Sequence, residues 1–292
     1  MRRKFQEVVS KLIENDPSTV LLLGDIGVFG FRNQMAEHPE RVINVGILEQ
    51  AMTGIAAGLS KAGLNPIIHS IAPFIVERTF EQLKIDFGYQ NLRGNLISVG
   101  ASVDYAALGA THHCPGDISL LLSIPNIEIY VPGTITELDY LLRESLQNNK
   151  FSYFRLTENP AASQESANLK NGSILREGRD LTIIAFGPFI QEALEIGEEL
   201  DAQVIYFNKM APFDGQILLE IQHFEKIVLL EPFYEGTMIH QVLPFIKRPA
   251  QFVSIGFPRE FIHTYGKYAD QVAHLGLNKS GVLERVRSEF ND

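Results

Sequence analysis

Polar and glycine-rich residues follow three apolar segments of this sequence, at the points where predicted strands end. The groups are residues 24–27 (Gly-Asp-Ile-Gly), residues 46–50 (Gly-Ile-Leu-Glu-Gln) and the loop 107–114, which contains Thr-His-His-Cys. Ligands of doubly wound sheets bind beyond the carboxyl ends of the strands. We therefore expect the chemistry of this protein to lie in these three groups.

Glu49 opens a predicted helix, residues 49–61, whose next residues are mostly small or apolar. Burial of a carboxylate raises its proton affinity, whereas a helix N-terminus opposes that rise. Such a group can hold or release a proton for a bound molecule. The position also suits a carboxylate that only caps the helix. The spacing leaves both roles open.

His112 and His113 lie in a loop rich in Gly and Ala, where adjacent side chains diverge and one can enter a cleft. Either histidine can act as an acid, a base or a hydrogen-bond donor, and the alternative is a solvated surface histidine. A zinc site built from these two residues with Cys114 and Asp117 is disfavoured, because structural zinc sites use spaced pairs of Cys and His and this chain has one Cys.

Other ligand-binding motifs are absent from the sequence. Gly24, Gly27 and Gly30 do not form the G-x-G-x-x-G of dinucleotide-binding folds. A phosphate-binding G-x-x-x-x-G-K-[ST] and a G-x-S-x-G nucleophile elbow are also missing. These absences disfavour NAD-dependent enzymes, P-loop nucleotide hydrolases and serine hydrolases.

Apolar runs alternate with amphipathic segments in both halves of the chain, which is typical of a mostly parallel sheet with helices on both faces. In the first half the predicted strands are 19–24, 41–45, 66–70, 95–99, 127–131 and 152–156, and the predicted helices are 2–14, 49–61, 76–87 and 134–147. In the second half the predicted strands are 181–186, 203–207, 226–231 and 251–255, and the predicted helices are 189–200, 214–222 and 236–246. We therefore predict an α/β protein with two doubly wound, mostly parallel-sheet domains, 1–160 and 176–292, joined by a polar linker at 161–175.

The composition of the chain limits the kinds of partner that it can bind. Its 292 residues carry a net charge of -10 and form no cluster of Lys and Arg, which disfavours nucleic acid and anionic membranes. No apolar run approaches the roughly 20 residues that span a bilayer, and the basic N-terminus lacks the apolar core of a signal peptide. With the single Cys114, these features predict a cytoplasmic protein.

Four segments, in order, resemble the transketolases, the deoxyxylulose-phosphate synthases and the β subunits of 2-oxo-acid dehydrogenases. They are 46–59 (GILEQAMTGIAAGL), 78–82 (RTFEQ), 109–113 (GATHH) and 124–132 (IPNIEIYVP). Residues 174–292 resemble the C-terminal domain of the same family. The resemblance implies a pyrimidine-binding domain followed by a transketolase C-terminal domain, and thiamine diphosphate as the cofactor.

The resemblance also implies roles for individual residues. Glu49 matches the glutamate that hydrogen-bonds N1′ of the cofactor's aminopyrimidine and so favours its imino tautomer. Phe74 falls where the family places an aromatic ring against the pyrimidine. Asp25 and Ile26 fall in the loop that faces the cofactor, and His112 matches the histidine that contacts the reacting carbonyl oxygens.

The family binds Mg²⁺ and the diphosphate through a Gly-Asp-Gly motif in a separate N-terminal domain, and this sequence contains no Gly-Asp-Gly. The resemblance therefore implies that the partner is an N-terminal, diphosphate-binding transketolase subunit, with two copies of each chain and the active sites at their interfaces. The metal would be held by that partner, so no metal ligand is expected in this chain. Alone, the chain should be inactive.

The sequence departs from the family pattern at positions where, by the resemblance, relatives contact the substrate. Leu108 occupies the place of an aspartate that touches a substrate hydroxyl, and His113 replaces a glutamine. An arginine that holds substrate phosphate is replaced by Thr157, and a phosphate-contacting histidine falls near Gly100 or Ala101. Because a lost charge-assisted contact weakens phosphate binding, we hypothesise a modified or unphosphorylated acceptor, such as a nucleotide-linked keto sugar.

The sequence leaves three candidate functions. The first is transfer of a two-carbon ketol unit between sugars, the second is the β subunit of a 2-oxo-acid decarboxylase or dehydrogenase, and the third is a non-catalytic scaffolding paralogue. The Thr-His-His sequence favours the first, and Glu49 together with His112 disfavours the third. In the C-terminal half we expect Glu231, His240 and His263 to be solvent-exposed or capping groups.

Overall fold

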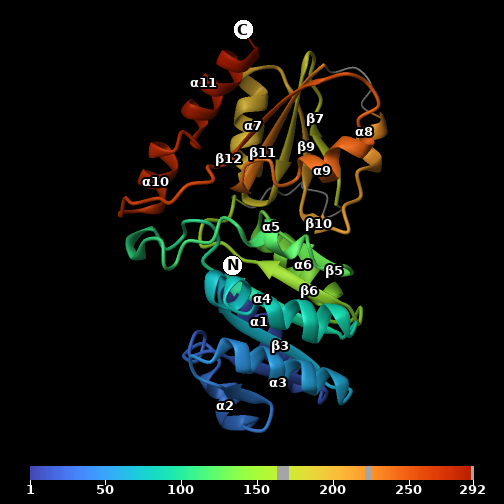
Figure 1. The fold of residues 1–292 in the computed structure, drawn as a ribbon, viewed down its shortest axis with the longest axis vertical. Coiled ribbons are helices and arrows are strands. Elements are labelled where there is room, and N and C mark those ends of the chain that lie inside the picture. The colour runs from blue at the N-terminus through green and yellow to red at the C-terminus, as the bar shows by residue number, and fades with distance from the viewer. Residues whose placement is uncertain (163–170, 221–224, 291–292) are drawn as a thin grey trace.

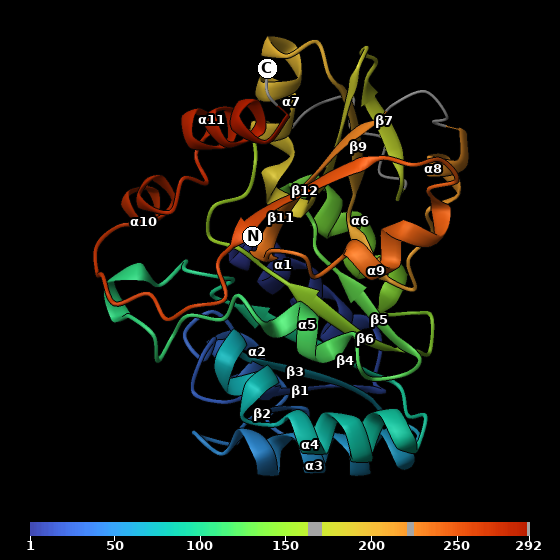
Figure 2. The same ribbon diagram turned by 45° about the horizontal axis from the view of Figure 1, so that its top comes forward.

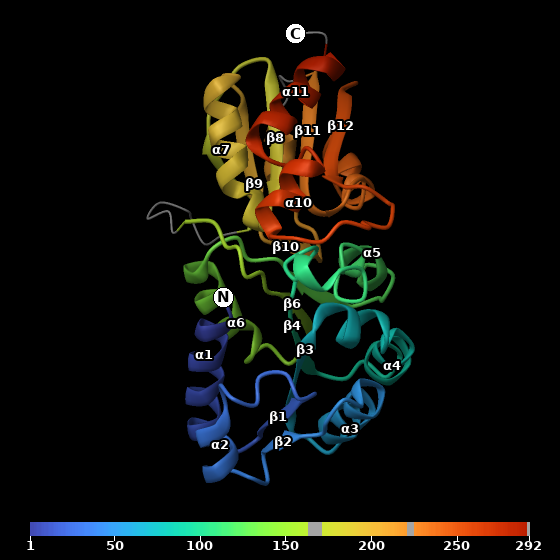
Figure 3. The same ribbon diagram turned by 90° about the vertical axis from the view of Figure 1, so that its left-hand side faces the viewer.

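Two β-sheets, one from each half of the chain, form the framework of the protein (Figure 1). The structure is a computed structural model, and it describes residues 1–162, 171–220 and 225–290. Both sheets are mostly parallel, and helices cover both faces of each sheet (Figure 3). The predicted α/β architecture with two doubly wound sheets is therefore confirmed.

The first sheet has seven strands in the order β10-β5-β6-β4-β3-β1-β2. They are β1 (Thr19–Leu23), β2 (Val42–Asn44), β3 (Asn65–Ile71), β4 (Gly94–Val99), β5 (Ile127–Tyr130), β6 (Phe151–Arg155) and β10 (Lys209–Ala211). All neighbours are parallel except β10, which runs antiparallel to β5. Every residue of β1, β3, β4 and β6 is buried, as expected of parallel strands covered on both faces.

Helices lie on both faces of this sheet (Figure 3). One face carries α1 (Arg2–Asn15), α2 (Arg32–Glu37) and α6 (Ile135–Ser145), and the other carries α3 (Glu49–Lys61), α4 (Phe80–Gln82), α5 (Asp117–Leu121) and the π-helical segments η1 (Pro73–Glu77) and η2 (Leu83–Tyr89). Helix α1 buries Phe5, Val8, Val9 and Ile13, a stripe at helical spacing. Helix α1 thus packs on the sheet through the apolar stripe from which it was predicted.

The second sheet has five strands in the order β12-β11-β8-β9-β7. They are β7 (Ser173–Arg176), β8 (Leu181–Phe186), β9 (Gln203–Phe207), β11 (Lys226–Tyr234) and β12 (Gln251–Phe257), and only β7 is antiparallel to its neighbour. One face carries α7 (Ile190–Glu199), α10 (Tyr268–His274) and α11 (Lys279–Phe290), and the other carries α8 (Gln216–Glu220), α9 (Ile239–Val242) and the 3₁₀ turn η5 (Leu243–Phe245) (Figures 1 and 3).

The two halves share a core. One buried apolar cluster contains residues of both sheets, among them Phe151 of β6 and Phe207 of β9. The carboxylate of Glu137, buried in α6, accepts hydrogen bonds from the Tyr206 hydroxyl and the Asn208 side chain of the second half, at 2.9 Å each. Strand β10, from the second half, also pairs with β5 in the first sheet. Apolar packing, buried polar contacts and strand pairing therefore connect the two halves.

Several elements differ from those predicted. The helix expected at 76–87 is three shorter pieces, because the chain turns at residues 78–79 between η1 and α4. The helix expected at 236–246 shortens to α9 and η5, where Pro244 cannot donate a helical hydrogen bond. The elements missed entirely are short or near the C-terminus: α2, α5, α10, α11, β7 and β10.

The expected linker also differs in part. Strand β7 begins at Ser173, inside the segment 161–175, and pairs with β9. Residues 163–170 of that segment, and residues 221–222 of the helix expected at 214–222, lie outside the described residues.

Candidate active site

The three predicted groups meet at the carboxyl edge of the first sheet. Residues 24–27 follow β1, and residues 46–50 lead from β2 into α3. Because β1 pairs with β2 and β3 in parallel, the ends of these strands lie side by side. Segment η1 follows β3 and brings Phe74 to the same edge.

Glu49 is almost completely buried, with 2% of its surface exposed. No side chain caps helix α3, whose N-cap is Leu48. The carboxylate instead accepts a hydrogen bond at Oε2 from Nη1 of Arg78, at 2.7 Å. Helix capping, the alternative role for Glu49, is therefore not what its side chain does in this structure.

Arg78 links Glu49 to the predicted aromatic residue. The centre of its guanidinium lies 4.4 Å from the centroid of the Phe74 ring, a distance typical of cation–π contacts. The Arg78 side chain remains 42% exposed. No sequence pattern indicated a role for Arg78, although this residue begins one of the family-like segments.

His112 also contacts Phe74. The two ring centroids are 5.2 Å apart and the rings meet edge to face, at 70°. Tyr105 approaches the same imidazole at 6.3 Å, and the Thr111 hydroxyl is 2.9 Å from its Nδ1. The structure therefore brings Glu49, Phe74 and His112 together in one chain of contacts through Arg78.

Asp25 and Ile26 occupy the loop after β1. Asp25 has a left-handed backbone (φ 62°), which Asp tolerates better than most residues. The Asn44 side chain donates to the Asp25 carboxylate at 2.8 Å and accepts from the backbone N–H groups of Asp25 and Gly46. Asn44 thus ties this loop to the segment that leads into α3.

His69 lies buried beneath the Asp25 loop. A Cβ on Gly27 would stand 2.8 Å from its ring, so only glycine fits there. Its Nδ1 faces the Ile97 carbonyl at 2.8 Å, and its Nε2 has no hydrogen-bond partner in the structure. Burial lowers the pKa of His69 to about 4, because the charged imidazolium would lose its hydration.

We expect His69 to make the protein less stable in mild acid. The folded-state pKa is below that of an unfolded histidine, so folding opposes protonation, and stability falls as the pH drops from about 6.5 to about 4. Between about pH 7.5 and about pH 5 this loss should be about 2 kcal/mol. Urea denaturation at both pH values should show a smaller loss for His69→Gln than for wild type, whereas the exposed His240→Gln should match wild type. Equal losses in all three proteins would contradict the assignment.

His113 diverges from His112, as adjacent loop residues were expected to do. It is 8% exposed and its Nε2 has no partner in the structure. Burial and the neighbouring His112 lower the pKa of His113. His112, half-buried at the Phe74 ring, is therefore the histidine better placed to meet a ligand.

The four residues considered for zinc do not converge. The Cys114 thiol faces Glu77 at 3.5 Å, and Asp117 forms a buried ion pair with Arg155 at 2.8 Å. Burial raises the pKa of the Cys114 thiol well above its usual value. Across residues 1–162, 171–220 and 225–290, no group of three or more His, Cys, Asp or Glu side chains is arranged to hold a metal ion.

The outer part of the site receives a residue from the C-terminal half. Leu108 is 52% exposed at the end of the 3₁₀ turn η3 (Ala106–Leu108). A Cβ on Gly109, whose φ is 73°, would stand 2.5 Å from the ring of Tyr265. The segment between β12 and α10, which contains Tyr265, lies beside this loop (Figure 2). No periodicity or motif in the sequence pointed to Tyr265.

The residues near the expected phosphate position are acidic or already paired. Thr157, where the resemblance places an arginine in relatives, is buried, and its hydroxyl donates to Asp104 at 2.9 Å. Arg155, two residues earlier, is held by Asp117. Burial raises the pKa of Asp104.

In the C-terminal half, His240 and His263 are exposed and Glu231 is buried. The Glu231 carboxylate accepts hydrogen bonds from the backbone N–H groups of Gly236 and Met238 and from the Ser254 hydroxyl. Burial raises the pKa of Glu231 to about 7. Its contacts are those of a carboxylate that caps backbone groups of a loop.

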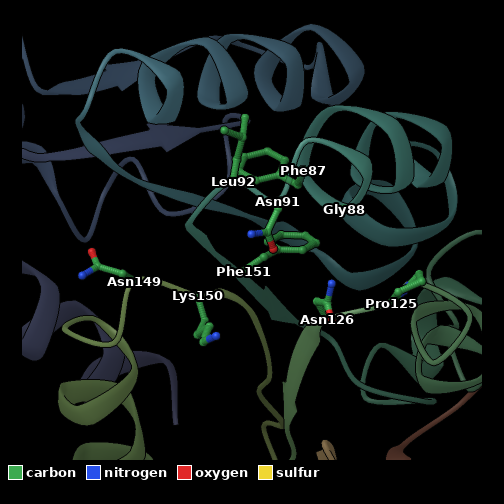
Figure 4. Close-up of a pocket in the computed structure, with 9 residues that line it drawn as sticks. All are labelled: Phe87, Gly88, Asn91, Leu92, Pro125, Asn126, Asn149, Lys150 and Phe151. Atoms are coloured by element: carbon green, nitrogen blue, oxygen red, sulfur yellow. The ribbon is translucent and has the colours of Figure 1, made fainter.

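A polar pocket lies at the opposite, amino-terminal edge of the first sheet (Figure 4). It has a volume of about 50 Å³, and its lining includes Asn91, Asn126, Asn149, Lys150 and Phe151. A neighbouring recess of about 670 Å³ shares part of this wall. None of the predicted site residues lines either pocket.

The chain is similar to known proteins along most of its length. The family model described as "Transketolase, pyrimidine binding domain" matches residues 1–162. An uncharacterized 33.6 kDa protein in the fasciation locus of Rhodococcoides fascians is 33% identical, over 97% of this chain and 93% of that protein. One subunit of the apulose-4-phosphate transketolase of Phocaeicola vulgatus is 27% identical, over 97% of this chain and 95% of its own length.

Longer relatives match over part of their length. The 1-deoxy-D-xylulose-5-phosphate synthase of Dechloromonas aromatica is 31% identical over 88% of this chain, which spans only 43% of the synthase. The solved structure "Split gene transketolase, inactive beta4 tetramer" superposes with a TM-score of 0.84 at 24% identity, covering 99% of this chain and 97% of that one. That likeness shows the same fold.

Within the described residues, no helix is both long enough and apolar enough to cross a membrane.

Proposed function

This chain belongs to the transketolase family through its pyrimidine-binding domain, and on that premise we propose that it is a thiamine-diphosphate-dependent subunit that transfers two-carbon ketol units between sugars. It would act in a complex with a separate subunit that binds the diphosphate and Mg²⁺, most simply with two copies of each chain.

The observation that carries this proposal is the environment of Glu49. One planar cation, the Arg78 guanidinium, donates to the buried carboxylate of Glu49 and lies over the aromatic ring of Phe74. An aminopyrimidine protonated at N1′ is likewise planar and can make both contacts. The residues of this chain therefore fit the pyrimidine half of thiamine diphosphate.

Each residue then has a physical task. Glu49 would hold a proton at N1′, and Phe74 would fix the plane of the pyrimidine. Asp25 and Ile26 would border the cofactor from the neighbouring loop. His112 would donate a hydrogen bond to the carbonyl oxygen of the sugar, and Leu108 and His113 would shape the substrate cleft. When bound, thiamine diphosphate supplies the nucleophilic carbon and the electron sink for carbon–carbon cleavage.

A relative and the exposed surface both support a partner chain. The relative of matching length from Phocaeicola vulgatus is named as one subunit of a transketolase. Beside the buried Glu49, Ile47 and Leu48 are 67% and 61% exposed. Large apolar side chains exposed next to a site are typical of a surface that another chain covers.

We expect Leu48→Asp to prevent assembly with the diphosphate-binding subunit. A charge in the centre of an apolar interface loses hydration without a partner, so the dissociation constant should rise about 100-fold or more. Analytical ultracentrifugation of the mixed subunits measures it. Ile135→Asp is the matched control, since Ile135 is exposed at the start of α6 and an acidic residue suits a helix N-terminus. Unchanged assembly of Leu48→Asp would show that this surface is not the interface.

For the acceptor we propose a modified or unphosphorylated sugar, such as a nucleotide-linked keto sugar. Where a phosphate-binding arginine is expected, Thr157 is bonded to Asp104 and the neighbouring Arg155 is already paired. A carboxyl group in this place offers no attraction to a phosphate dianion. The reconstituted complex should therefore turn over unphosphorylated acceptors at least about as well as phosphorylated ones. Strong turnover of xylulose 5-phosphate with ribose 5-phosphate, compared under matched conditions, would contradict this.

Reconstitution tests the function itself. Each subunit alone and their mixture should be titrated with thiamine diphosphate, then assayed for ketol transfer and for CO₂ release from 2-oxo acids. Ketol transfer by the mixture alone supports the proposal. Release of CO₂ from pyruvate or a branched 2-oxo acid without ketol transfer would favour the decarboxylase alternative. A mixture that binds cofactor but turns nothing over would favour a scaffolding role.

A further inference from the structure

Arg78 occupies both contacts that the proposed pyrimidine site offers. Its Nη1 donates to Glu49 Oε2 at 2.7 Å, and the central carbon of its guanidinium lies over the Phe74 ring, 4.4 Å from the ring centroid. A guanidinium is planar, carries its hydrogen-bond donors in that plane and stacks on aromatic faces. In these respects it resembles the aminopyrimidine that would bind the same two groups.

A ligand cannot reach Glu49 while Arg78 stays in place. Glu49 is 2% exposed, whereas the Arg78 side chain that is bonded to it is 42% exposed. The cover over the carboxylate is therefore the partly solvated end of a long side chain. In the part of the chain that the structure describes, the guanidinium makes no other hydrogen bond or ion pair. Among those described residues, no other polar group holds the guanidinium over Phe74.

The pair also explains how a carboxylate can stay buried before the cofactor arrives. A buried charge without a partner is strongly destabilising. Arg78 supplies a positive charge and a hydrogen-bond donor to Glu49 from the solvent side. The cofactor-free chain thus keeps its acidic residue neutralised by a group that can leave towards water.

We propose that Arg78 is a placeholder for the aminopyrimidine: it neutralises Glu49 and covers Phe74 in the free chain, and it must swing out before the pyrimidine can bind. This inference rests on the proposed function, because it takes Glu49 and Phe74 as the pyrimidine site. Arg78 is accordingly a positioning residue that competes with the cofactor. Removing its side chain should strengthen pyrimidine binding and should lower the stability of the chain without ligand.

The test uses this chain and the pyrimidine half of the cofactor, 4-amino-5-hydroxymethyl-2-methylpyrimidine. Ligand-observed NMR should give a dissociation constant about tenfold lower for Arg78→Ala than for wild type, equivalent to about 1.4 kcal/mol. Lys84→Ala, which removes an exposed positive charge from the adjacent segment η2, should bind as wild type does. Without probe, Arg78→Ala should melt at a lower temperature, and saturating probe should raise its melting temperature more than that of wild type.

The outcomes separate this inference from the proposed function. Suppose that Arg78→Ala binds the probe no more tightly than wild type, and that Glu49→Gln binds it more weakly than both. Arg78 is then not a placeholder, but Glu49 is still the residue that binds the pyrimidine. No binding by wild type or any variant overturns both. If Arg78→Ala does not fold, Arg78→Gln serves instead, with the same expected gain. The double variant Glu49→Gln, Arg78→Ala should lose that gain, because the gain depends on the freed carboxylate.

Discussion

We expect replacement of Glu49 by Gln to lower the turnover number of the proposed assembled enzyme by about 10²–10⁴-fold, the range usual for loss of a positioned acid–base group. Gln has nearly the shape of Glu and still offers an oxygen to a hydrogen-bond donor, but it cannot exchange a proton with N1′. Glu49 is 2% exposed, so water cannot substitute for the missing carboxyl group. The measurement is the turnover number at saturating cofactor and donor sugar.

Cofactor binding distinguishes this effect from simple loss of the site. Because Phe74, the Asp25 loop and the partner chain remain, the affinity of the assembled Glu49→Gln complex for thiamine diphosphate should change far less than turnover does. Glu81→Gln is the control, since Glu81 is an exposed carboxylate in the next helical segment. Turnover of Glu49→Gln within a few-fold of wild type would remove the basis of the proposed mechanism.

Breaking the buried ion pair between Asp117 and Arg155 should cost about 3–5 kcal/mol of unfolding free energy. The two side chains are 0% and 1% exposed, and the Arg155 Nε donates to the Asp117 carboxylate at 2.8 Å. Either Asp117→Leu or Arg155→Leu leaves an unpaired charge in the interior. Arg155 also donates to Ser102, whose hydroxyl donates to the Pro232 carbonyl, so the pair lies where the two halves meet.

Guanidinium chloride denaturation of the single and double variants tests this pair. The double variant Asp117→Leu, Arg155→Leu buries no unpaired charge and should lose less stability than the sum of the single variants. The matched control is the exposed pair of Asp139 and Arg143 on α6, 33% and 46% exposed, where Arg143→Leu should cost about 0.5 kcal/mol or less. Similar costs at both pairs would mean that burial does not govern the energy of the Asp117 pair.

Helix α3 and strands β1, β3 and β4 follow directly from local sequence. The strands are rich in apolar residues and buried at every position, as in a sheet that is covered on both faces, and the predicted bounds of α3, 49–61, are those observed. The resemblance added Phe74, and it favoured His112 over His113 as the histidine that contacts the reacting carbonyl oxygens. The contacts among Glu49, Phe74 and His112 fit that expectation, and their roles remain predictions.

What the sequence by itself determined is the order of the strands other than β7 and β10, the order of helices α1, α3, α6 and α7, the α/β class and the residue that begins α3, because apolar periodicity and turn residues act over a few neighbours. The tertiary structure alone decided that Arg78 covers Glu49, 29 positions away in the sequence. It also decided that Tyr265 reaches Gly109 and that Arg155 is paired with Asp117 rather than free for phosphate. Such contacts join residues that are distant along the chain, and which charged groups meet depends on how the sheets stack, a matter that local patterns do not encode.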